Sequence, residues 1–200
     1  MKKLLVATRN PGKTSEIRQK LAPRGFEVLS LLDSGLDISV VEDEESFSGN
    51  AIKKAVAVSR ATGGPALADD SGLEVRALGG APGVWSARYG GEALSDRQRC
   101  EKLLAELAEA TPENRSARFC SVLAYAEPKK APVIFEGMLT GSIALALAGD
   151  LGFGYDPIFI PEGYDKTLAE LGPHIKNRIS HRAKALDAFI AWLAANLKIA

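Results

Sequence analysis

The sequence predicts an α/β protein whose mixed sheet is flanked by helices. In the first third of the chain, short apolar runs such as residues 4–7 and 26–32 alternate with segments of helical periodicity. Later, residues 117–126 and 132–143 form two strand-like segments that follow each other without a helix between them. Alternation followed by a strand pair favours a mixed sheet over a purely parallel one. No repeat or linker interrupts the chain, so residues 1–200 are predicted to form a single domain, with room for two lobes.

The first helix is predicted from its start and stop signals. Asn10 suits an N-cap, and Pro11 suits the first helical position, where the N–H that proline lacks would have no intrahelical partner. Ile17 and Leu21 provide the apolar stripe, and Pro23 ends the helix.

The middle of the chain is predicted to contain a polar connector, a helix and a short strand. Residues 34–48 are acidic and polar, and a helix is predicted from about Gly49 to the Gly63-Gly64-Pro65 stop. The apolar run 66–68 is predicted to be a strand that ends at Asp69-Asp70-Ser71-Gly72, a sequence typical of a turn.

Two further helices are predicted from capping boxes, and a Gly-rich loop at 149–157 precedes the second of them. The boxes are Ser95 with Gln98 and Thr167 with Glu170. A last helix is predicted from an apolar face that consists of Ala183, Leu186, Ile190, Leu193 and Leu197.

The composition limits the classes of function. There are 25 Lys and Arg residues against 25 Asp and Glu residues, which argues against binding of nucleic acid through a basic surface. The longest apolar runs are too short for a membrane span or a signal peptide, so we expect a cytoplasmic protein with no membrane partner. Cys100 and Cys120 are expected to be free thiols.

The first chemical signal is a candidate phosphate site between the first strand and the first helix. A helix N-terminus presents unbonded N–H groups and the positive end of its dipole, and Gly12 allows close approach to the backbone. Arg9 and Lys13 add positive charge. The spacing nearly matches a P-loop, with Ala7 in place of the first Gly, so a P-loop nucleotidase stays open, as does a merely well-capped helix.

The second signal is the carboxylate pair Asp69-Asp70 at the predicted strand end. Ligands of open α/β sheets bind at such ends, and Mg²⁺ prefers carboxylate oxygens. One acid is alternatively a general base for an attacking water. The acidic run 42–45 supplies further candidate ligands, or is a solvated connector.

The third signal lies toward the C-terminus, where an aromatic loop and a basic cluster follow each other. Phe153 lies between two glycines, where its ring is available to stack on a base, and Asp156 is a candidate acceptor for a ring or sugar hydrogen. Four further residues gather near Ser180, and His181 among them is expected to be a neutral hydrogen-bonding residue. They are Lys176, Arg178, His181 and Arg182.

Taken together, the ordered motifs resemble the inosine triphosphate pyrophosphatase family, whose members are also described as dITP/XTP pyrophosphatases. The resemblance extends from residue 8 to residue 182. It is carried by Thr8-x-Asn10-x-x-Lys13, Asn50-Ala51 with Lys53-Lys54-Ala55, Ala68-Asp69-Asp70-Ser71-Gly72-Leu73, Gly80-Ala81-Pro82-Gly83-Val84-Trp85-Ser86-Ala87-Arg88-Tyr89, Gly152-Phe153-Gly154-Tyr155-Asp156-Pro157 and Ser180-His181-Arg182.

The resemblance implies a two-lobed fold, a homodimer, and Mg²⁺-assisted hydrolysis of ITP, dITP and XTP to the monophosphate and pyrophosphate. It implies that Asp70 is the general base and, with Glu42, a metal ligand; Glu44 and Glu45 remain alternatives to Glu42. The substrate-binding residues that it implies are Thr8, Arg9, Asn10, Pro11, Gly12, Lys13, Ser71, Phe153, Gly154, Tyr155, Asp156, Lys176, His181 and Arg182.

Two positions depart from the family pattern. Gly49 stands where many relatives carry an acid, and Trp85 stands where tyrosine is usual. Two rival functions remain at this point. A P-loop nucleotidase would release orthophosphate, and a non-catalytic nucleotide-binding regulator would bind triphosphate without turnover.

Overall fold

The structure is a computed structural model that describes residues 2–196. Within this part the chain divides into two compact units. The first unit comprises residues 2–70, 121–137 and 182–196, and the second comprises 71–120 and 138–181.

Residues 2–196 contain six strands, which form one mixed sheet in the order β2-β1-β3-β4-β5-β6. Strand β1 is parallel to β2 and to β3, whereas β6 is antiparallel to β5. The predicted mixed α/β class is therefore confirmed. The strands are β1 (Lys2–Val6), β2 (Phe26–Ser30), β3 (Ala66–Val75), β4 (Ser116–Ala126), β5 (Val133–Ile143) and β6 (Phe159–Pro161).

The helices include the four predicted from capping and stop signals. The α-helices are α1 (Pro11–Leu21), α2 (Leu31–Ser34), α3 (Phe47–Thr62), α4 (Asp96–Glu106), α5 (Leu168–Ile179) and α6 (His181–Asn196). The 3₁₀ helices are η1 (Ala22–Arg24), η2 (Arg76–Leu78), η3 (Gly83–Arg88), η4 (Pro112–Arg115) and η5 (Asp156–Ile158).

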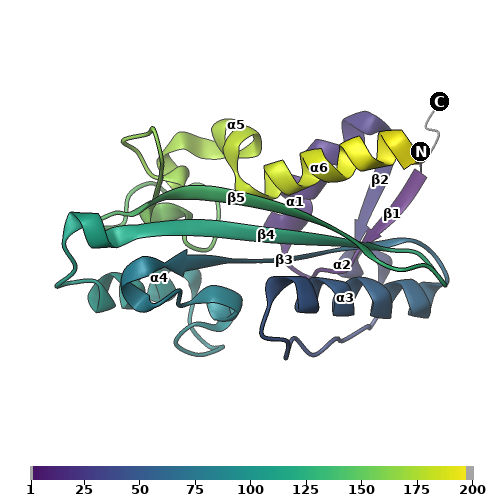
Figure 1. The fold of residues 1–200 in the computed structure, drawn as a ribbon, viewed down its shortest axis with the longest axis horizontal. Coiled ribbons are helices and arrows are strands. Elements are labelled where there is room, and N and C mark those ends of the chain that lie inside the picture. Colours follow the sequence, from purple (N-terminus) through teal and green to yellow (C-terminus); the bar gives the residue numbers. More distant parts are fainter. Residues whose placement is uncertain (1, 197–200) are drawn as a thin grey trace. The chain divides into compact units, whose positions relative to one another are not determined.

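In the first unit, helices cover both faces of the sheet (Figure 1). The alternation of side chains along β4 separates two cores, because Leu123 and Tyr125 face one side and Val122 and Ala124 face the other. Helices α1 and α6 pack on the first side through Ile17, Leu21, Leu186, Phe189 and Leu193. Helix α3 packs on the second side through Ala51, Ala55 and Val58.

The second unit has one core, in which α4 and α5 pack with strands β3 to β6. Leu103 of α4 and Leu168 of α5 are fully or almost fully buried there, together with Phe159 of β6. The same core contains Leu73, Val75, Phe119, Leu139 and Ile143. The ends of β3, β4 and β5 that belong to this unit are thus fixed by hydrophobic burial.

The predicted helix signals are confirmed in the structure. The Asn10 side chain caps α1, with Pro11 at its first position. Reciprocal capping boxes begin α4 at Ser95 and α5 at Thr167. Four of the five residues predicted for the last helix lie in α6, and the fifth, Leu197, lies outside the described residues.

The predicted end of the third strand is wrong. Strand β3 does not stop after Ala68 but continues through both aspartates to Val75. Asp69 and Asp70 are therefore consecutive strand residues, and their side chains point to opposite faces of the sheet. A strand tolerates two buried acids only where each finds a cation or donor on its own side.

Candidate functional site

The turn between β1 and α1 is fixed by its own side chains. The Asn10 Oδ1 accepts a hydrogen bond from the Lys13 N–H at 3.1 Å, and the Thr8 Oγ1 accepts one from the Asn10 N–H at 3.1 Å. The Gly12 N–H lies in the first helical turn, where a helix supplies no carbonyl partner. This turn therefore presents a donor and the positive end of the α1 dipole.

Asp69 organises a buried polar network on the side of the sheet where α1 and α6 pack. Its Oδ2 lies 2.8 Å from Lys13 Nζ and 3.1 Å from Arg182 Nη2, and its Oδ1 accepts a hydrogen bond from Ser121 Oγ at 2.6 Å. Arg182 also pairs with Glu16 of α1. The network contains two cations and two carboxylates, so its formal charge is balanced.

The charge of Asp69 is strongly favoured in this setting. Burial raises the pKa of the carboxyl group, but Arg182 and then Lys13 outweigh burial and hold the pKa well below its ordinary value. Asp69 is therefore an anion that fixes Lys13 beside the α1 N-terminus. Arg182, predicted to bind substrate, is almost fully buried by these contacts, and its role toward substrate stays a prediction.

Asp70 contacts a different cation, Lys54 of α3. The Lys54 Nζ lies 2.9 Å from Asp70 Oδ1, 3.0 Å from Glu42 Oε1 and 3.0 Å from the carbonyl oxygen of Asp69. Burial lowers the pKa of Lys54, but Asp70 and Glu42 outweigh that and raise it, so the ammonium group stays charged. Lys54 thus brings together the two carboxylates predicted as metal ligands.

The second oxygen of Asp70 is available for other chemistry. Asp70 Oδ2 is buried, and the structure of residues 2–196 gives it no hydrogen-bond partner. Burial raises the pKa of Asp70, and Lys54 and Lys13 counter only part of this increase. A buried carboxylate oxygen without a donor is suited to accept a proton or to bind a cation.

The donor set fits Mg²⁺, although it is small. Among the described residues, no group of three or more His, Cys, Asp or Glu side chains is arranged to hold a metal. Mg²⁺ is commonly bound by one or two carboxylates together with substrate phosphates and water. Asp70 and Glu42 supply such a pair, and Lys54 between them limits their mutual repulsion.

The acidic segment before α3 is held by Asn50. The Asn50 Oδ1 accepts from the Glu44 N–H at 3.1 Å, and its Nδ2 donates to the Glu44 carbonyl at 3.2 Å. An amide satisfies both backbone groups at once because it carries a donor and an acceptor. A Cβ at Gly49 would approach Glu44 Cβ to 2.8 Å, so the Gly49 departure leaves room for this arrangement.

Sequence reasoning assigned no role to four residues of these networks. Ser121 and Glu16 look like ordinary surface residues in the sequence, and they lie 52 and 166 positions from their partners. Lys54 and Asn50 belong to a quoted motif that carried no residue role. The best available signal was the helical position of Lys54, four residues after Asn50, on the buried side of α3.

In the second unit, the predicted Gly-aromatic loop surrounds a buried ion pair. Asp156 Oδ2 accepts from the Phe153 N–H at 2.9 Å and pairs with Lys176 Nζ, and both side chains are almost fully buried. The Lys176 Nζ also lies 4.1 Å from the centre of the Phe153 ring. These contacts orient Phe153 and give Asp156 a structural role in the loop.

Two other predicted residues of this unit, Tyr155 and His181, are buried. The Tyr155 hydroxyl donates to the Ser86 carbonyl at 2.9 Å. The His181 ring stacks on Phe119, with 4.7 Å between ring centres and 9° between planes. Ser71 lies on β3, partly buried.

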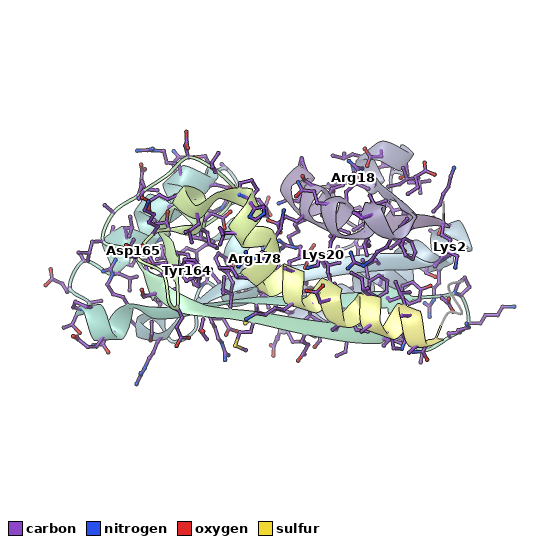
Figure 2. The ribbon with its side chains drawn as sticks, turned by 90° about the horizontal axis from the view of Figure 1, so that it is seen from above. Lys2, Arg18, Lys20, Tyr164, Asp165 and Arg178 are labelled. Atoms are coloured by element: carbon purple, nitrogen blue, oxygen red, sulfur yellow. The ribbon has the colours of Figure 1, made fainter. Side chains whose placement is uncertain are left out.

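A groove of about 750 Å³ also lies in the second unit, and its lining differs from the predicted site. Arg76, Arg118 and Tyr164 are among the residues that line it, and Tyr164 is labelled in Figure 2. None of the predicted site residues lines the groove.

No helix within residues 2–196 combines the length and apolar character that a membrane span needs.

Comparisons with known proteins agree with the motif order. The dITP/XTP pyrophosphatase of Bacillus subtilis strain 168 is 48% identical over 195 residues, which are 98% of this chain and 98% of the relative. The Staphylococcus aureus Ham1 protein superposes with a TM-score of 0.86 at 39% identity, over 97% of this chain and 99% of that one. A HAM1 protein from Coxiella burnetii also gives 0.86, at 40% identity, over 98% and 100%.

The family assignment follows from the extent of these matches. The sequence profile of the Ham1 family matches residues 4–192, which include every predicted site residue. The resemblance inferred from the motifs is therefore confirmed, and the chain belongs to the Ham1 family.

Proposed function

We propose that the protein hydrolyses the non-standard purine nucleoside triphosphates dITP, XTP and ITP to the monophosphate and pyrophosphate. The proposal is supported by full-length relatives named dITP/XTP pyrophosphatase at 46–50% identity. The observation that carries the chemistry is the cluster of Asp70, Lys54 and Glu42, with Lys13 held by Asp69 on the opposite face of β3.

The phosphate chain is assigned to the first turn of α1. The residues assigned to it are those of the β1–α1 turn and the start of α1, which are Thr8, Arg9, Asn10, Pro11, Gly12 and Lys13. The Gly12 amide and the Lys13 ammonium group neutralise charge on the leaving pyrophosphate, which is the main task in phosphoryl transfer. Asp69 restrains Lys13, so that less conformational entropy is lost when substrate binds.

Asp70 is assigned the role of general base. A water oxygen bonds to the α-phosphorus, the bond from that phosphorus to the α–β bridging oxygen breaks, and the water proton passes to Asp70 Oδ2. Burial raises the pKa of Asp70, which makes the carboxylate a stronger base. Asp70 and Glu42 are also the proposed ligands of Mg²⁺, which when bound supplies positive charge to the phosphate oxygens.

The purine base is assigned to residues of the second unit. Phe153 offers a ring face for stacking, with Gly154, Tyr155 and Asp156 shaping the loop that carries it. Ser71 and Lys176 are further proposed substrate residues of this unit, and His181 is the proposed donor to the purine 6-oxo group. Arg182, which belongs to the first unit, is also a proposed substrate residue. A donor to a 6-oxo group disfavours the 6-amino group of adenine, since a buried donor facing an amino group stays unsatisfied. Action as a homodimer in the cytoplasm completes the proposal.

A substrate panel tests the proposed function. ITP, dITP, XTP, ATP and GTP are incubated separately with the protein and Mg²⁺, and pyrophosphate and orthophosphate are measured. We expect pyrophosphate, with the three non-standard nucleotides turned over much faster than ATP and GTP. Orthophosphate as the first product supports the P-loop nucleotidase instead, and tight binding without turnover supports the regulator.

A further inference from the structure

The loop that carries Phe153 has little rigidity of its own. Phe153 stands between Gly152 and Gly154, whose φ angles are +85° and +62°. Glycine has the widest conformational freedom of any residue, and this loop is neither strand nor helix at these positions. The direction of the Phe153 ring therefore depends on which side chains form hydrogen bonds with the backbone on either side of it.

The first contact is made by the Asp156–Lys176 ion pair, which binds the N–H of Phe153. Asp156 accepts that hydrogen bond, and Lys176 holds Asp156 while facing the ring. Gly152 is required for this arrangement, because a Cβ there would lie 2.1 Å from Asp156 Oδ2. This contact fixes the loop on the N-terminal side of Phe153.

The second contact is made by side chains of α4, which form hydrogen bonds with the backbone of Gly154. Asp96 Oδ2 accepts a hydrogen bond from the Gly154 N–H at 2.7 Å, and Cys100 Sγ donates to the Gly154 carbonyl at 3.3 Å. Asp96 and Cys100 are four residues apart and so lie on the same face of the helix. One helix face thereby satisfies both backbone groups of a single loop residue.

Asp96, the acid of this second contact, is itself held in place. Arg99 Nη1 lies 3.2 Å from Asp96 Oδ1, the oxygen that does not face the loop. The capping box of Ser95 and Gln98 fixes the start of α4 immediately before Asp96. The acceptor is charged and the distance is short, which strengthens the bond to Gly154, but the Asp96 side chain is 55% exposed, so water screens part of this gain.

We infer that Asp96 is a positioning residue for purine recognition, acting on Phe153 through the backbone of Gly154, with Cys100 as its weaker companion. The inference rests on the proposed function, in which Phe153 stacks on the base. It assigns Asp96 an effect on affinity for the nucleoside part of the substrate and none on the handling of phosphates.

The test compares D96A, D96N and the control E101Q. Glu101 lies on the same helix and pairs with Arg97 in an exposed i,i+4 contact. We expect D96A to raise KM for ITP by about 3- to 10-fold with kcat within about 2-fold, because a hydrogen bond of ordinary strength is worth about a factor of 3 to 10. D96N keeps an acceptor oxygen and is expected to recover most of the affinity, and E101Q is expected to behave like the natural protein.

Binding measurements separate positioning from general damage. Calorimetric titration with IMP and, separately, with pyrophosphate is expected to show weaker IMP binding in D96A and unchanged pyrophosphate binding. An unchanged KM, or equal losses for IMP and pyrophosphate, overturns the inference. If D96A does not fold, C100A tests the same contact through the Gly154 carbonyl. We expect C100A to raise KM for ITP less than D96A would, and an unchanged KM contradicts the inference. If the natural protein binds IMP but turns over no ITP, the proposed function fails while the IMP comparison still decides the role of Asp96.

Discussion

Asp69→Asn removes the charge at the centre of the buried network in the first unit. Arg182 is then left with Glu16 as its ion-pair partner, and its side chain is only 2% exposed. Removing one partner of a buried ion pair typically costs about 3–5 kcal/mol, and here it leaves two cations, Lys13 and Arg182, against the single carboxylate of Glu16. For a chain of this size, each kcal/mol lowers Tm by roughly 2–4 °C, so we expect a decrease of roughly 6–20 °C.

The matched control is Asp187→Asn, which removes an ion pair between α1 and α6, the helices that carry Glu16 and Arg182. Asp187 of α6 pairs with Lys20 of α1 at 2.9 Å, and Figure 2 shows Lys20 beside α6. The Asp187 side chain is 54% exposed, so the loss is expected to be about 0–1 kcal/mol. Urea unfolding followed by circular dichroism gives both free energies of unfolding. Similar losses in the two variants would refute the reasoning that burial makes the Asp69 network strong.

The pH dependence of the stability difference between the natural protein and D69N provides a second test. The pKa of Asp69 is depressed in the folded state, so its stabilising effect is fully present above the unfolded-state value of 3.8. The effect is lost as the pH falls through the lower folded-state pKa. We therefore expect the stability difference between natural protein and D69N to be constant near neutral pH and to shrink below about pH 4. A difference that grows on acidification contradicts the assignment.

Three other outcomes follow from the geometry. Asp70→Asn is expected to lower kcat for ITP by at least about 100-fold, measured as pyrophosphate release, because the proton acceptor is lost. Lys54→Met is expected to move the acid limb of kcat/KM to higher pH, since Lys54 lowers the pKa of Asp70, whereas Lys53→Met, which removes an exposed pair, is expected to leave the limb in place. Cys100 is expected to resist alkylation at pH 8 until the protein is denatured, because burial raises the pKa of its thiol to about 12; rapid native labelling, detected by peptide mass spectrometry, contradicts this.

The fold was predictable wherever local chemistry decides the conformation. Asn10 with Pro11, and the pairs Ser95–Gln98 and Thr167–Glu170, specify helix starts through side chains within three residues of each other, and all three are confirmed. The alternating apolar pattern of β4 and β5 is equally local. Such signals need no knowledge of the tertiary structure.

The course of β3 was not predictable, because distant residues decide it. Aspartate is unfavourable in strands and common in turns, so Asp69-Asp70 indicated an end to the strand. The acids are accommodated by Arg182, 113 positions away, and by Lys54, 16 positions away. The motif order gave the site residues, but it could not show that Asp69 restrains Lys13 while Asp70 contacts Lys54.

Hydrolysis of ITP in ¹⁸O-labelled water tests the central claim most directly. Attack of water on the α-phosphorus places the label in IMP and leaves pyrophosphate unlabelled, and this is the expected result. Label in pyrophosphate or in orthophosphate would place the attack at another phosphorus and contradict the roles proposed for Asp70 and Lys13.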